Sequence, residues 1–101
     1  MTPQREVICF VIVAEAILES RLLNGLVACG ARGWTVTAAR GEGPRNRRES
    51  EVEGGNVRIE ALVSPVVTER IWSMLTDDYF PHYALAAWTV EVKVARHERY
   101  T

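Results

Sequence analysis

A long polar segment, Gly41 to Gly55, separates two runs of residues that are typical of β-strands. The run before it is Trp34–Arg40, and the run after it is Asn56–Val63. The segment has fifteen residues with one apolar side chain, Val52, whereas connections inside compact domains usually take about 4–6 residues. Loops of this length tend to be functional or to lack fixed structure. We therefore expect a mobile loop at 41–55 between two antiparallel strands.

The charges of this loop divide by sign along the chain. Gly41 and Gly43 flank Glu42 where the first strand ends, and glycines at such a place let backbone N–H groups approach an anion. The pattern fits an anion-binding loop that also reaches a partner protein, and it equally fits the solvated tip of a hairpin. The basic side chains at the entry are Arg40, Arg45, Arg47 and Arg48, and the acidic ones at the exit are Glu49, Glu51 and Glu53.

The run Glu6–Ala14 is continuously apolar and rich in β-branched residues, which predicts a central strand. A domain of two layers covers only one face of its sheet with its own helices. The second apolar face then needs a cover, and another copy of the same chain is the simplest one. One face carries Val7, Cys9, Val11 and Val13, and the other carries Ile8, Phe10 and Ile12.

The remaining elements alternate between helix and strand. Leucines at helical spacing predict a helix over Glu15–Cys29, which Gly30 is placed to end. Ser64 and Pro65 are typical of a helix start, and Asp77-Asp78 marks its end. An aromatic turn, Tyr79–Tyr83, leads to the last strand, Ala84–Ala95. The order β-α-β-β-α-β predicts an α+β, ferredoxin-like fold with both helices on one face of the sheet, as a single domain over residues 1–101.

Composition excludes several classes of function. A net charge of −1 argues against a nucleic-acid binder, and no apolar run reaches the length of a membrane span. No basic region leads from the N-terminus into a cleavable signal, so we expect a cytoplasmic protein. Cys9 and Cys29 form neither a metal-type spacing nor a disulfide framework, and His82 and His97 have no ligand partners at metal spacing. No nucleophile-and-base pattern appears, so we expect neither an enzyme nor a metal protein.

The stretch GWTVTAARGEG resembles the PII signalling proteins, in which such a strand runs through two glycines into a long mobile loop. Asn56–Glu60 also resembles the strand that leaves that loop, and the order of elements agrees over nearly the whole chain. The matching positions are Gly33, Thr35, Val36, Thr37, Gly41 and Gly43.

Two departures from that family narrow the resemblance. YFPHYALAAW replaces the usual glycine-rich turn with its Lys, and the long loop has no Tyr that could be uridylylated. With RGEG and YF-x-x-YA present, the chain looks more like the PII-like branch associated with carboxysomes and bicarbonate transport. That branch implies a non-enzymatic homotrimer that binds ADP, AMP or ATP in clefts between subunits, with bicarbonate as a candidate second effector. It also implies a protein partner, such as a bicarbonate transporter or a carboxysome component, through which the cytoplasmic protein could associate with a membrane or a carboxysome.

The resemblance also implies roles for individual residues. On the phosphate side of the cleft it places Thr35, Gly41, Gly43 and Arg45. Glu60 and Leu62 match positions near the base and ribose, and Arg96 or Arg99 would approach the phosphates from a neighbouring subunit. The missing Lys turn leaves the phosphates to arginines, whose planar multi-donor groups suit them. The loop residues that would contact the partner are Arg47, Arg48, Glu49 and Ser50.

Three other functions share this order of elements. RNA-recognition domains carry exposed aromatic residues on their third strand, and NVRIEALV has none. A small enzyme of this fold would need a nucleophile and base. An amino-acid-binding regulatory domain stays open, and a ligand screen would separate it from a nucleotide sensor.

Overall fold

The computed structural model describes residues 5–41 and 55–99 of the chain. Its elements follow the order predicted from the sequence, strand-helix-strand-strand-helix-strand, with two short 3-10 turns in addition. They are β1 Arg5–Glu15, η1 Ala16–Leu18, α1 Glu19–Cys29, β2 Thr35–Ala39, β3 Asn56–Val63, α3 Pro65–Asp78, β4 Ala86–Val94 and η2 His97–Arg99. Neither α-helix in these ranges has the length and apolar character that a membrane crossing requires.

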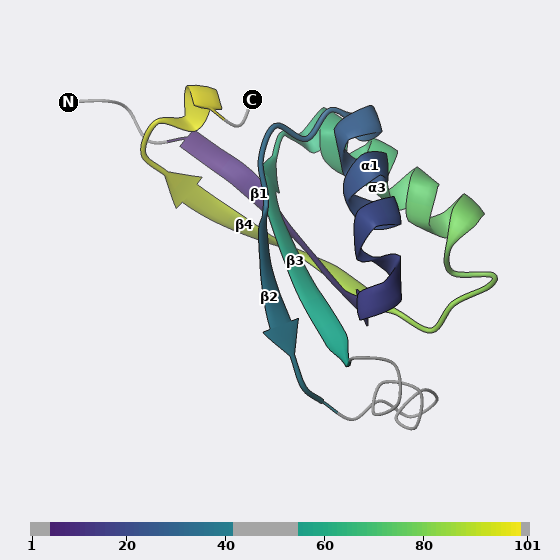
Figure 1. The fold of residues 1–101 in the computed structure, drawn as a ribbon. Helices are drawn as coiled ribbons and strands as arrows, with labels where there is room; N and C mark the ends of the chain where they lie inside the picture. The colour runs from purple at the N-terminus through teal and green to yellow at the C-terminus, as the bar shows by residue number, and fades with distance from the viewer. Residues whose placement is uncertain (1–4, 42–54, 100–101) are drawn as a thin grey trace.

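The four strands form one antiparallel sheet in the order β2-β3-β1-β4. Both α-helices lie on the same face of this sheet (Figure 1). This arrangement confirms the predicted α+β, ferredoxin-like fold. The connection between β2 and β3 runs from residue 40 to residue 55, as the sequence indicated.

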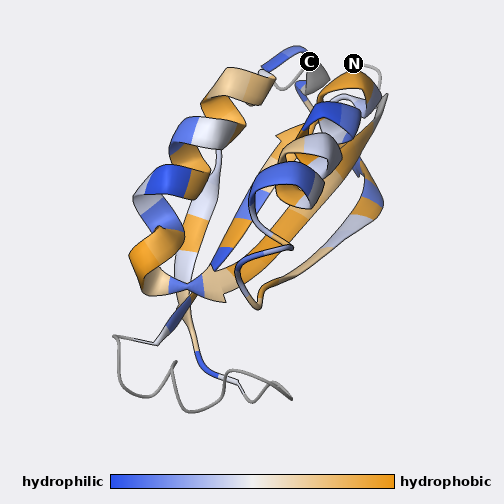
Figure 2. Cartoon of the chain, turned by 90° about the vertical axis from the view of Figure 1, so that its right-hand side faces the viewer, coloured by the Kyte–Doolittle hydropathy of each residue, from blue (hydrophilic) through white to orange (hydrophobic). Residues whose placement is uncertain are grey.

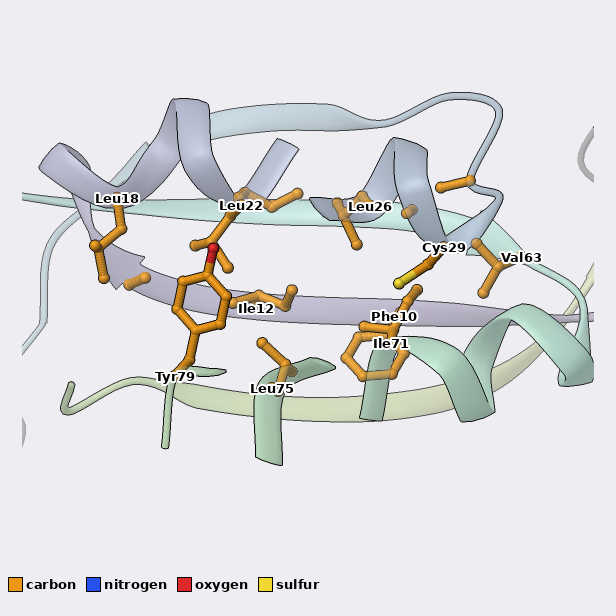
Figure 3. Packing of buried hydrophobic residues seen from close by; sticks show 14 of the residues in the cluster. Phe10, Ile12, Leu18, Leu22, Leu26, Cys29, Val63, Ile71, Leu75 and Tyr79 are labelled. Atoms are coloured by element: carbon orange, nitrogen blue, oxygen red, sulfur yellow. The ribbon is translucent and has the colours of Figure 1, made fainter. Parts of the chain in front are cut away.

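The core lies between the helices and the face of the sheet that they cover. Figure 3 shows side chains of α1 and α3 converging on Phe10 and Ile12 of β1. The ring of Phe10 also packs against Trp72 of α3, with ring centres 4.7 Å apart. Burial of these apolar groups is the main stabilising term of such a small domain. The helix side chains with 0–1% exposure are Leu22, Leu26, Ile71 and Leu75.

The predicted helix signals act as expected at both the start of α3 and the end of α1. The Oγ of Ser64 accepts a hydrogen bond from the backbone N–H of Val67 at 3.3 Å, and Pro65 occupies the first turn of α3. Gly30 ends α1 with φ of +112°, a left-handed conformation that favours glycine. Figure 2 shows the two helices side by side over the sheet, with hydrophilic and hydrophobic residues alternating along each.

The predicted start of the first helix is wrong by four residues. Glu15 belongs to β1 and pairs with Asn56 of β3, and the 3-10 turn η1 precedes α1. Pairing with a strand that is distant in the sequence overrides the local helical pattern here. The ends of the second and fourth strands differ from the predicted ones by one or two residues, and β3 agrees.

The face of the sheet that the helices leave uncovered is called the open face here. Strand register places alternate residues of β1 on each face, which confirms the two apolar faces predicted for the first strand. On the open face, Trp88 is 38% exposed and Val90 is 48% exposed in the single chain. The apolar residues of this face are Val7, Cys9, Val11 and Val13 of β1, Leu62 of β3, and Trp88, Val90, Val92 and Val94 of β4.

Candidate functional site

Gly41 lies at one end of the sheet. It comes two residues after β2, whose last residue, Ala39, pairs with Asn56, which in turn pairs with Glu15 at the end of β1. A Cβ added to Gly41 would meet no atom of the described residues within 4 Å, and its φ is not in the left-handed region. Neither packing against residues 5–41 and 55–99 nor backbone geometry therefore requires glycine at this position. A glycine here would let a ligand or partner approach the backbone closely.

The candidate arginines of the C-terminal segment lie at the other end. Arg96 follows β4, whose last residue, Val94, pairs with Arg5 at the start of β1. Arg96 has φ of +61°, which residues other than glycine rarely adopt. The backbone N–H of Arg99 donates to the carbonyl of Arg96 at 3.0 Å and closes the turn η2. The turn η2 lies beside β1, so the backbone of both arginines lies near the start of this strand.

The two ends of the sheet are far apart within one chain. The strand β1 has eleven residues and rises about 3.3 Å per residue, so its ends are separated by roughly 30 Å. Figure 1 shows η2 and the end of β2 at opposite ends of the sheet. Gly41 and Arg96 of the same chain therefore cannot contact one phosphate group.

Thr35 and Glu60 face each other on the open face. They are directly paired in the β2–β3 ladder, and Leu62 follows two residues later on the same face. Thr35 lies six residues before Gly41 along an extended segment, roughly 20 Å away. Within one chain, Thr35 thus groups with Glu60 and Leu62, the positions expected near the base and ribose, and not with Gly41.

Arg58 adds a charged group that the sequence analysis did not assign to the site. Its Nε and Nη2 each lie 3.0 Å from the Oε2 of Glu60. Its guanidinium carbon also lies 5.4 Å from the ring centre of Trp88, within the range of a cation–π contact. The pairing of Arg58 with Glu60 is one that their spacing on one strand face predicts, and it is confirmed. The contact with Trp88 could not be predicted in this way, because it bridges two strands that are not adjacent.

The open face also affects the thiol of Cys9. Burial raises the pKa of Cys9 above its ordinary value, and the nearby carboxylate of Glu60 raises it further, while Arg58 lowers it. The thiol is therefore protonated and unreactive near neutral pH. Among the described residues, no group of three or more His, Cys, Asp or Glu side chains could hold a metal ion.

The aromatic turn after α3 is fixed by Arg21 of α1. The Nη1 of Arg21 donates to the hydroxyl of Tyr83 at 2.8 Å, and its guanidinium carbon lies 5.3 Å from the ring centre of Tyr79. The hydrogen bond to Tyr83 is the main reason why the pKa of Arg21 is raised. The turn leads into β4, which starts at the same end of the sheet as Gly41, where Ala86 pairs with Val13.

The chain matches a known protein family over most of its length. The sequence profile of the family described as "Nitrogen regulatory protein P-II" matches residues 9–99. The chain belongs to the PII family. A protein from Thermus thermophilus, described as a PII-like signalling protein, has a solved structure with 42% sequence identity and a TM-score of 0.84 over 97% of this chain and 98% of that one.

More distant structures of the PII family share the fold. CPII from Thiomonas intermedia, in a structure bound to ADP and bicarbonate, has 14% identity and a TM-score of 0.87 over all of both chains. GlnK from Bacillus subtilis, in a complex with ATP, has 16% identity and a TM-score of 0.62 over 86% of this chain and 84% of that one. No curated protein sequence matches the chain significantly.

Some predicted site residues lie outside the described residues. They are Gly43, Arg45, Arg47, Arg48, Glu49 and Ser50. The loop that we expect to be mobile also lies largely outside the described residues. The roles of these six residues and the mobility of the loop therefore stay predictions.

Proposed function

We propose that this PII protein is a non-enzymatic regulatory sensor that assembles as a homotrimer and binds ADP, AMP or ATP in clefts between its subunits. The observation that carries the proposal is the separation of the two candidate phosphate-binding groups. Gly41 and the arginines Arg96 and Arg99 lie at opposite ends of the sheet. A phosphate held by both groups must lie between two copies of the chain.

The open face supports assembly. Its most exposed apolar side chains, Trp88 and Val90, keep 38% and 48% of their surface accessible in the single chain. Large exposed apolar patches usually mark interaction surfaces. A second copy would bury them and bring the C-terminal turn of one subunit toward the loop of another.

The ligands of CPII support the choice of effectors. Structures of that protein contain ADP, AMP and bicarbonate. We propose an adenine nucleotide as the main effector of this chain and bicarbonate as a second one, so that the protein reports energy or inorganic-carbon status in the cytoplasm. The loop at 41–55 would pass this signal to a partner, a bicarbonate transporter or a carboxysome component, through Arg47, Arg48, Glu49 and Ser50.

Two measurements on the wild-type chain test the proposal. Sedimentation equilibrium should give three times the chain mass of 11.3 kDa. Calorimetric titration with AMP, ADP, ATP and cyclic AMP, each with and without bicarbonate, should identify the effectors. A monomer at micromolar concentration that binds no nucleotide would contradict the proposal. Binding of amino acids instead of nucleotides would favour an amino-acid-binding regulatory domain.

A further inference from the structure

The carboxylate of Glu60 is held through one of its two oxygens. Both donors of Arg58, Nε and Nη2, point at Oε2, each at 3.0 Å. Within residues 5–41 and 55–99, no hydrogen bond reaches Oε1. An ionised carboxylate accepts on both oxygens, so Oε1 can accept a hydrogen bond from a further donor. The side chain of Glu60 is 39% exposed, which leaves room for that donor.

Trp88 supports Arg58 in the orientation in which its Nε and Nη2 point at the Oε2 of Glu60. The guanidinium of Arg58 reaches from β3 across β1 to the ring of Trp88 on β4, 5.4 Å away. Beneath it, Val11 lies between Glu60 and Trp88 in the ladder and is only 1% exposed. A planar guanidinium can stack on a ring while two of its N–H groups point at one oxygen, and an ammonium cannot. Arg58 is thus held on one side by a ring and on the other by a carboxylate.

The surroundings of Oε1 combine polar and apolar groups. Thr35 is exposed and lies directly across from Glu60, so its hydroxyl is available on the same face. Leu62, two residues further along β3, adds a half-buried apolar side chain. An acceptor oxygen, a hydroxyl and an apolar surface together suit a flat ligand with an N–H or O–H at its edge.

We propose that Arg58, backed by Trp88, is a positioning residue that keeps the Oε1 of Glu60 directed at a donor on the adenosine part of the bound nucleotide. This inference rests on the proposed function, since the ligand is taken to be an adenine nucleotide. Adenosine offers such donors at the amino group of adenine and at the ribose hydroxyls. A carboxylate discriminates against a ligand that presents an acceptor or nothing at that point, because the bound ligand would then cover Oε1 and leave it without a donor.

Selectivity between nucleotides tests this role better than affinity alone. Titrations would compare ADP with IDP, in which a carbonyl replaces the amino group, and with 2′-deoxy-ADP, which lacks one ribose hydroxyl. We expect the wild type to prefer ADP about tenfold or more over one of the two analogues. The rejected analogue identifies the donor. In Arg58→Met this preference for ADP should fall to about twofold or less. In Arg58→Lys the preference should be intermediate between those of the wild type and Arg58→Met.

A purely structural role of Arg58 would change the result in another way. It would weaken ADP and both analogues by the same factor and leave their ratios unchanged, which would overturn the inference. Arg32→Met is the matched control, because Arg32 is an exposed arginine between α1 and β2, and it should keep wild-type ratios. If Arg58→Met does not assemble, Arg58→Lys carries the same comparison.

The outcomes separate this inference from the proposed function. A wild type that binds ADP equally well as both analogues overturns the role of Glu60 and Arg58 but leaves nucleotide sensing intact. A wild type that binds none of the three overturns both. Unchanged ratios in Arg58→Met and Arg58→Lys, with ADP still bound, overturn only the positioning role.

Discussion

Replacement of Gly25 by alanine tests how tightly α1 and α3 pack over the sheet. A Cβ at this position would overlap the Sδ of Met74 on α3 and lie 3.3 Å from its Cε. Alanine in place of glycine favours a helix by about 1 kcal/mol, whereas an extra methyl group in a packed core costs about 1–3 kcal/mol. Since methionine side chains adapt easily, we expect a net loss of about 0–2 kcal/mol in the free energy of unfolding.

The Met74→Ala background should reverse the sign of this effect. With the long side chain removed, Gly25→Ala should stabilise the protein by about 1 kcal/mol, because only the helix preference remains. Urea unfolding of the four proteins at one fixed concentration measures this difference, since the stability of an oligomer depends on concentration. Asn24→Ala, an exposed neighbour on α1, is the control and should have the same effect in both backgrounds. Equal stabilisation by Gly25→Ala in both backgrounds would refute the packing argument.

Three further predictions concern the site and the core. Arg45→Ala should weaken ADP binding roughly ten- to a hundredfold by loss of a charge-assisted hydrogen bond, while adenosine binds both proteins alike; equal ADP affinity in calorimetry would exclude Arg45 as a phosphate ligand. Glu60→Gln should lower the pKa of Cys9 and Arg58→Met should raise it, because the two charges act on the thiol in opposite directions. The pKa is measured from the thiolate absorbance against pH, with Cys9→Ser as the correction for other groups. An unchanged pKa in both variants would mean that the two charges lie far from Cys9. Phe10→Ala, at 1% exposure, should lower the free energy of unfolding by about 3–5 kcal/mol, and a loss below about 1 kcal/mol would contradict the core described above.

Much of the fold could be predicted because local signals and tertiary structure agree. The alternation in Asn56–Val63 gives the bounds of β3, and Ser64 with Pro65 gives the start of α3. The start of α1 could not be predicted in this way. Glu15–Leu18 continues the helical leucine pattern, and only the pairing of Glu15 with Asn56 shows that the strand extends so far.

The positions of the candidate site residues on the sheet could be predicted only in part. Alternation along β3 puts Glu60 and Leu62 on one face. The pairing of Thr35 with Glu60, which groups Thr35 with them and not with Gly41, depends on the register between β2 and β3. The contact of Arg58 with Trp88 was not predictable, because it joins residues thirty positions apart on strands separated by β1. The separation of Gly41 from Arg96 likewise depends on the register of the whole sheet, which the motifs themselves do not contain.

Mixed trimers test most directly the claim that each nucleotide lies between two subunits. Arg45→Ala impairs the loop side of every cleft, and the double variant Arg96→Gln/Arg99→Gln impairs the C-terminal side. Each pure variant should bind ADP roughly ten- to a hundredfold more weakly than the wild type. After subunit exchange, every mixed trimer should contain one cleft with both sides intact and bind one ADP with wild-type affinity. A mixture that binds no more tightly than the pure variants would contradict a site shared between subunits.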